Sequence, residues 1–246
     1  MNNDGIQRYW TAIQALQKQV IDEQAELLGR VAAAMAETIS ADRRIFLFGT
    51  GHSHMLAEEG HYRAGGLAPV VPILLSSLSL NESAVLSGQL ERTAGLAEPL
   101  LARYRPQPEE LLFIFSNSGV NQLPVEMALA AKKRELRVVA VSSLAYARIA
   151  PLSALGQRLA DIADFTINNG GQPGDSLVSF EGLPWRVGPS STVIGSLIWN
   201  ALVTETVRLL HEAGADVPIY ASSNMPGAVE HNARLIDKWR GLNPHL

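Results

Sequence analysis

The sequence contains no cysteine, which excludes disulfides, thiolate metal sites and cysteine nucleophiles. It also has no excess of positive charge: 20 Lys and Arg face 24 Asp and Glu, for a net charge of −4, so nothing indicates a nucleic-acid partner. The first eight residues are polar and no apolar run looks long enough to cross a membrane. We therefore expect a cytoplasmic protein without a membrane partner.

Two apolar runs each lead into a loop of small polar residues. The run 45–48 enters the loop 49–54 (Gly-Thr-Gly-His-Ser-His), and the run 111–115 enters the loop 116–121 (Ser-Asn-Ser-Gly-Val-Asn). A helical pattern follows each loop. This is how α/β proteins present backbone N–H groups to an anion, with glycine allowing close approach and serine adding donors. The pair of loops predicts one phosphorylated ligand held from two sides.

Alternating strand and helix patterns predict an α/β fold, a doubly wound parallel sheet flanked by helices. In such sheets ligands bind beyond the carboxyl ends of the strands, where both loops lie. Strands are expected at 45–48, 70–75, 111–115, 137–141, 161–167 and 217–222. Helices are expected at 6–39 (with Gly29 as a possible break), 53–63, 81–105 (broken), 122–134, 191–213 and from Pro226 onward, with Asn224 as its cap. The Gly- and Pro-rich stretch 168–190 is too long for a simple connector, so it is a candidate wall of the site.

Two common nucleotide-binding motifs fit poorly. The segment Gly49-Thr50-Gly51 supplies two glycines of the dinucleotide pattern G-x-G-x-x-G, but His54 stands at the third position. No acidic residue ends the next strand to bind a ribose. The Gly-Lys-Ser/Thr of a P-loop is absent from both loops. We expect no bound cofactor.

The segment Ser116-Asn117-Ser118-Gly119-x-Asn121 resembles the S-x-S-G-x-T/S loop of sugar isomerase (SIS) domains, and Gly49-x-Gly51-x-Ser53 resembles their first loop. The likeness covers nearly the whole chain. Within that family the sequence looks closest to an uncharacterised bacterial group, UPF0309, which is also labelled phosphoheptose isomerase-like. The resemblance implies a single SIS domain over 1–246, a flavodoxin-like three-layer sandwich. Helical segments at 1–40 and 223–246 would flank it.

The resemblance also implies which residues bind phosphate. In the family both loops contact the phosphate of a phosphosugar, and no lysine or arginine is needed. Asn121 departs from the usual Thr or Ser, although its amide can still donate a hydrogen bond. Carried over position by position, the phosphate-binding residues are Gly51, Ser53, Ser116, Asn117, Ser118, Gly119 and Asn121.

Isomerisation of a sugar phosphate needs a base and an acid. Glu59 follows the first loop in the helical stretch where heptose isomerases carry polar active-site residues, so we assign it as the base. Glu58 points elsewhere, and a surface role for both glutamates stays open. His231 near the final helix is the candidate acid, because many SIS enzymes complete the pocket with a late histidine or lysine, often from a second subunit. Pairing of His231 with Glu230 is the alternative.

Other residues are candidates for the sugar or for a metal. His52 in the first loop and Glu181 in the stretch 168–190 are expected to contact substrate, and Asp175 is a further acceptor. Some heptose isomerases bind zinc through the first-loop helix and a later helix. Here Thr192 and Asn200 occupy the later positions, so we expect no metal.

The sequence therefore predicts a phosphosugar-binding SIS protein, most simply an aldose–ketose or amino-sugar phosphate isomerase. A lyase that cleaves an ether of an amino-sugar phosphate is the first alternative, and a non-catalytic sugar-phosphate sensor is the second. SIS domains usually build their pocket across a dimer, and the long first helix suits an interface. We therefore expect a homodimer or a larger homo-oligomer.

Overall fold

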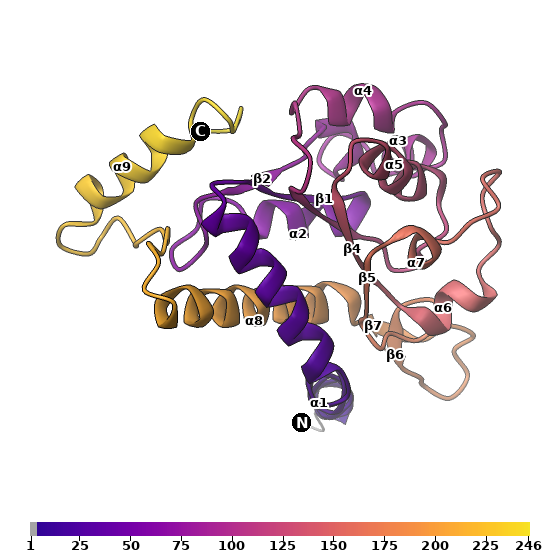
Figure 1. Ribbon diagram of the computed structural model, residues 1–246. Coiled ribbons are helices and arrows are strands. Elements are labelled where there is room, and N and C mark those ends of the chain that lie inside the picture. The colour runs from indigo at the N-terminus through magenta and orange to yellow at the C-terminus, as the bar shows by residue number, and fades with distance from the viewer. Residues whose placement is uncertain (1–3) are drawn as a thin grey trace.

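Five parallel strands form the centre of the protein in this computed structural model, which describes residues 4–246 (Figure 1). They are β1 (Ile45–Gly49), β2 (Val70–Pro72), β3 (Leu111–Phe115), β4 (Arg137–Ser142) and β5 (Phe165–Asn168). Their order across the sheet is β2-β1-β3-β4-β5. The chain leaves β1 toward β2 on one side and returns to β3 on the other, so the winding reverses between β1 and β3. This order confirms the predicted doubly wound, flavodoxin-like fold.

Helices cover both faces of the sheet, because successive strand residues point to opposite faces and both are apolar. The first face carries α1 (Asp4–Ser40), α2 (His54–Glu59) and α8 (Ser191–Glu212). The second carries α4 (Ala97–Ala102), α5 (Gln122–Lys133) and α7 (Leu159–Ile162). Leu47 and Phe113 belong to the first core, whereas Phe46 and Leu112 belong to the second.

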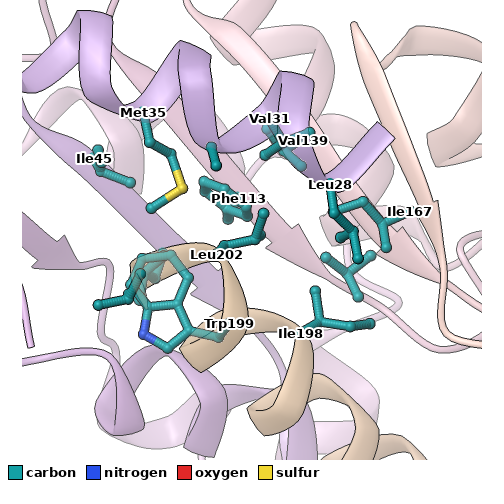
Figure 2. Close-up of a cluster of buried hydrophobic side chains, with 14 of the residues drawn as sticks. Leu28, Val31, Met35, Ile45, Phe113, Val139, Ile167, Ile198, Trp199 and Leu202 are labelled. Carbon is teal, nitrogen blue, oxygen red and sulfur yellow. The ribbon is translucent and has the colours of Figure 1, made fainter. Parts of the chain in front are cut away.

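The core of the first face is built where α1 and α8 cross over the sheet (Figure 2). Met35 of α1, Leu202 of α8 and Phe113 of β3 point toward one another there. The Trp199 ring of α8 meets the Phe113 ring edge-on, with ring centroids 5.3 Å apart at 83°. Each large side chain buried in this way contributes about 1.5–3 kcal/mol. The two helices are thereby fixed relative to the strand that precedes the second loop.

By length and composition alone, α8 is long and apolar enough to cross a membrane, with a mean hydropathy of 1.3 over an 18-residue window. That qualifies the expectation that no apolar run reaches this length. However, 44% of the window is buried inside the protein. Ile194, Ile198, Trp199 and Leu202 lie in the core of the first face. A helix buried in a protein core can be equally long and apolar, so the length and composition of α8 are weak evidence for a membrane span.

The first helix is kinked at Gln24, where the backbone leaves helical geometry (φ −123°, ψ 15°), and not at Gly29. The Gln24 side chain explains the position. Its Nε2 donates to the carbonyl of Asn168 (2.6 Å), and its Oε1 accepts from the N–H of Asn168 (2.8 Å). The kink lets one side chain bond the backbone at the end of β5. A cause so distant in sequence leaves no trace in the local pattern.

Three expected strands are wrong in whole or in part. The strand expected at 70–75 ends at Pro72. Residues 159–162 form the short helix α7, because Asp161 accepts a hydrogen bond from the N–H of Arg158 and caps it, so β5 begins only at Phe165. The stretch 217–222 joins neither sheet. It makes a single antiparallel bridge, between Ile219 and Leu67, beside the backbone that precedes β2. A segment with alternating apolar residues can pair with a loop as well as with a strand of a sheet.

The remaining elements are α3 (Ala84–Leu90), α6 (Leu144–Ile149), α9 (Ala228–Trp239) and the antiparallel pair β6 (Ser176–Val178) and β7 (Val187–Pro189). The β6–β7 pair occupies the stretch 168–190 and packs on the start of α1, where the Arg8 guanidinium lies 4.8 Å from the ring centroid of Phe180. The last helix begins at Ala228 after Gly227, whose φ is +78°, and not at Pro226. The expected cap at Asn224 is therefore wrong.

The C-terminal residues dock beside β2 through two histidines. His245 Nε2 lies 3.0 Å from the Tyr104 hydroxyl, which accepts a hydrogen bond from the N–H of Leu74 (2.8 Å). The His61 ring lies 6.1 Å from the His245 ring, nearly edge-on. Burial lowers the pKa of His61. Burial also lowers the pKa of His245, and the charges of His61 and Arg103 lower it further.

We expect the protein to lose stability as the pH falls from about 7.5 to about 5.5. Free histidine titrates near pH 6.5, so the unfolded chain takes up protons in this range that folded His61 and His245 resist. The urea midpoint at the two pH values measures the effect. The double variant His61→Gln/His245→Gln is expected to show a flatter pH dependence. An unchanged difference between the two midpoints would contradict this assignment.

Candidate functional site

The first loop is a tight turn that requires its glycines. A Cβ on Gly49 would lie 2.3 Å from the carbonyl oxygen of Ser53, and Gly51 has a φ of +57°. The N–H of Ser53 donates to the carbonyl of Thr50 (3.0 Å), which closes one turn of 3₁₀ helix immediately before α2. His52 is exposed on this turn. The short polar segment is therefore folded back against the end of β1.

The second loop also depends on a glycine. Gly119 has a φ of +62°, and a Cβ there would lie 3.1 Å from the Ser142 hydroxyl at the end of β4. The N–H of Gly119 donates to the hydroxyl of Ser116 (3.3 Å), which is only 4% exposed. Ser116 thus holds the loop together from inside. Asn117 is braced by its neighbours too: its carbonyl accepts from the N–H of Ser143 (2.9 Å).

The sheet brings the two loops to one edge. Strands β1 and β3 are parallel neighbours, and Gly49 at the end of β1 lies opposite Phe115 at the end of β3. Both loops therefore leave the sheet side by side at the point where the winding reverses. This is where ligands bind in open α/β sheets.

Backbone donors remain free at the second loop. The N–H groups of Ser118, Val120 and Asn121 have no hydrogen-bond acceptor within residues 4–246. Groups of this kind are nearly always paired in proteins, with water or a ligand if not with protein. The first turn of α5 adds little, because the N–H of Leu123 is taken by the carbonyl of Glu91 (2.9 Å) and Pro124 has none. The free N–H groups therefore belong to the loop itself more than to the end of the helix.

A cavity of about 470 Å³ opens beside these donors. Ser118 and Asn121 line it, and Tyr146 of α6 and Ser153 stand among its other lining residues. Arg92 also lines it and is the only charged side chain among those lining residues. Arg92 belongs to the turn after α3, 24 residues before the second loop begins. The sequence gives no local signal for its role, because only the fold brings that turn to the cavity.

Glu59 lies outside this cavity, at the end of α2. Its carboxylate pairs with Arg63 and lies 3.4 Å from the Asn200 amide of α8, with 34% of the side chain exposed. Glu58 points elsewhere and pairs with His54: Oε1 of Glu58 lies 2.9 Å from Nδ1 of His54. The two glutamates thus have different partners, as the sequence indicated. Only Glu59 reaches the helix that carries Asn200.

The remaining candidate residues lie on other elements of the fold. Glu181 is exposed in the connection between β6 and β7. His231 lies on α9, where its Nε2 is 2.7 Å from the carbonyl of Ile219. Asp175 caps α8 by accepting from the N–H of Ser191 (2.8 Å) and from its hydroxyl (2.6 Å). Neither the candidate acid His231 nor the suggested substrate contacts Glu181 and Asp175 line the 470 Å³ cavity.

Within residues 4–246, no group of three or more His, Asp or Glu side chains comes together as metal ligands. Glu59 and Asn200 do approach each other from the two helices that the zinc-site comparison concerned. One carboxylate and one amide are a poor donor set for zinc, which prefers imidazole, thiolate and carboxylate ligands.

A family model described as "SIS domain" matches residues 8–143. UPF0309 proteins of Brucella canis and of Brucella suis biovar 1 are each 40% identical over 239 residues, which is 97% of this chain and 98% of theirs. The likeness thus extends over nearly the full length of both proteins.

Solved structures share the fold at low identity. A phosphoheptose isomerase from Francisella tularensis aligns with a TM-score of 0.57 at 13% identity, over 84% of this chain and 98% of that one. The phosphoheptose isomerase of Neisseria gonorrhoeae gives 0.56 at 14%, over 82% and 97%. The sugar isomerase domain of an RpiR transcription factor from Sphaerobacter thermophilus gives 0.51 at 17%, over the whole of both chains. These likenesses concern the fold alone.

Proposed function

This chain belongs to the SIS domain family, and we propose that it binds a phosphorylated sugar at the loops 49–54 and 116–121. One observation carries the proposal: the free N–H groups of Ser118, Val120 and Asn121 stand at a cavity that could hold a sugar. Backbone N–H groups converging on one space form a site for an anion, and phosphate accepts several such bonds at once. The phosphoheptose isomerases that share this fold support a sugar as the part of the ligand that carries the phosphate.

We further propose that the bound sugar phosphate is isomerised by proton transfer, with Glu59 as the base. From the first loop, α2 leads about one and a half turns to Glu59, or roughly 8 Å. Glu59 does not line the cavity at the second loop, so the proposal requires the sugar to extend from its phosphate along α2. Asn200 would steady the carboxylate through the contact at 3.4 Å. His231 as the acid that opens the ring stays a prediction, since its Nε2 is engaged by a carbonyl.

The experiment is NMR of the purified protein in D₂O with hexose, hexosamine, N-acetylhexosamine, lactyl-ether amino-sugar and heptose phosphates. Deuterium at the carbon beside the carbonyl, together with a new sugar phosphate, would establish isomerisation and name the substrate. Release of lactate would establish the lyase. Broadening of the phosphorus signal without turnover would establish a sensor. If every phosphorus signal stayed sharp, the phosphosugar proposal itself would fail.

We expect Ser118→Ala to weaken binding of the sugar phosphate by about 10- to 100-fold. Ser118 lines the cavity, and its hydroxyl would bond a charged phosphate, an interaction usually contributing about 1.5–3 kcal/mol. Titration followed by phosphorus NMR measures the dissociation constant. The exposed Ser223, outside this cavity, provides the control Ser223→Ala, which should bind like the unaltered protein. Equal affinity in both variants would remove Ser118 from the site.

A further inference from the structure

Arg92 is one of the residues that line the cavity at the second loop. Its turn follows α3, which packs against the 3₁₀ turn of the first loop, and Arg92 lines the same cavity as Ser118 and Asn121 of the second loop. Its guanidinium is held only lightly: Nη1 donates to the carbonyl of Gly88 (2.6 Å) and lies 3.7 Å from Glu91. The side chain is 64% exposed, so it can turn into the cavity without breaking packed structure.

Glu91 fixes the backbone from which Arg92 extends. Its Oε1 accepts a hydrogen bond from the Thr50 hydroxyl (2.7 Å) in the first loop. Its carbonyl accepts from the N–H of Leu123 (2.9 Å) at the start of α5, just beyond the second loop. Thr50 is buried, so the first of these bonds is sheltered from water. One residue thus ties the turn to both loops and sets where the next side chain begins.

We propose that Arg92 is a direct ligand of the phosphate group and gives the site its selectivity for charged over uncharged sugars, with Glu91 as its positioning residue. The inference rests on the proposed function and adds a cation to it. Neutral N–H and hydroxyl donors bring no charge of their own to offset that of a phosphate. A guanidinium is always charged and can bond two phosphate oxygens at once, so it favours the phosphorylated ligand.

Inorganic phosphate is the probe, and its dissociation constant is measured by phosphorus NMR titration. Arg92→Ala is expected to weaken phosphate binding by about 10- to 100-fold, because a charge-assisted hydrogen-bonded pair is lost. Arg92→Lys should bind with intermediate affinity, since it keeps the charge but not the two-pronged geometry. Arg234→Ala, at an exposed position on α9, removes the same charge away from the cavity and should bind normally. The thermal midpoint of each variant verifies folding.

The outcomes separate this inference from the proposed function. If the unaltered protein binds phosphate and Arg92→Ala binds it equally well, the role of Arg92 is overturned while the loop site stands. If the unaltered protein does not bind phosphate at all, both proposals fail.

The positioning role of Glu91 is tested by a double-mutant cycle. Glu91→Gln should weaken phosphate binding several-fold when Arg92 is present and have little effect in the Arg92→Ala background. A purely structural role of Glu91 would give the same loss in both backgrounds and would overturn the positioning role.

Discussion

Replacing Glu59 by glutamine is expected to lower kcat for the sugar-phosphate reaction by about 10²- to 10⁴-fold, with little change in KM. General acid–base catalysis contributes an effect of this size, and an amide cannot accept the proton. Glutamine keeps the length of the side chain and can still contact Asn200. The bound sugar should therefore stay in place while turnover is lost, which is the pattern of a group that acts in the transition state.

The neighbouring glutamate provides the matched control for this experiment. Glu58→Gln changes the same kind of side chain one position earlier, but Glu58 is exposed and pairs with His54. Its turnover should remain close to that of the unaltered protein. Deuterium incorporation by NMR measures the proton-transfer step directly in both variants. Unchanged incorporation in Glu59→Gln would remove Glu59 as the base, whatever the effect of Glu58→Gln.

The second large effect concerns stability. Glu110→Ala is expected to lower the free energy of unfolding by about 3–5 kcal/mol, because it leaves Arg44 buried without its counter-ion. The two side chains are 3% and 4% exposed, and Arg44 Nε and Nη2 donate to the two carboxylate oxygens of Glu110 at 2.7 and 2.9 Å. The pair sits just before β1 and β3, the strands that carry the two loops. A loss of this size is a large share of the stability of an average domain.

Urea unfolding measures this loss, and a surface ion pair provides the comparison. Glu98 pairs with Arg134 where the carboxylate is exposed to solvent, so Glu98→Ala should leave the midpoint nearly unchanged. A double-mutant cycle with Arg44→Met isolates the pair, since the double variant should lose less than the sum of the single losses. A Glu110→Ala midpoint equal to that of the unaltered protein would contradict the prediction.

Local patterns were enough to predict most of the fold. The runs 45–48 and 111–115 are apolar at every position, as expected of strands in a sheet that is covered on both faces. The structure has strands β1 and β3 there. The prediction failed at one local cap and at one tertiary contact. Asp161 turned the start of an expected strand into a helix, and 217–222 paired with a loop.

The candidate site shows the same division. The two loops were found because glycine and serine at strand ends are a local signal, and the strand order places them together. Arg92 could not be found, since its place depends on how the turn after α3 packs against the first loop. His231 and Glu181 have side chains suited to proton transfer and to binding a sugar. The sequence does not indicate how far these side chains lie from the loops. Their roles stay predictions.

The hydrogen bonds between Gln24 and Asn168 have a consequence for how the sheet ends. Strand β5 lies at the border of the sheet, where unpaired backbone groups usually invite another chain to add a strand. Here a side-chain amide imitates a neighbouring strand, with one donor and one acceptor, and α1 lies over the border (Figure 1). The sheet is thereby prevented from growing at its β5 end, which leaves β2 as its other border.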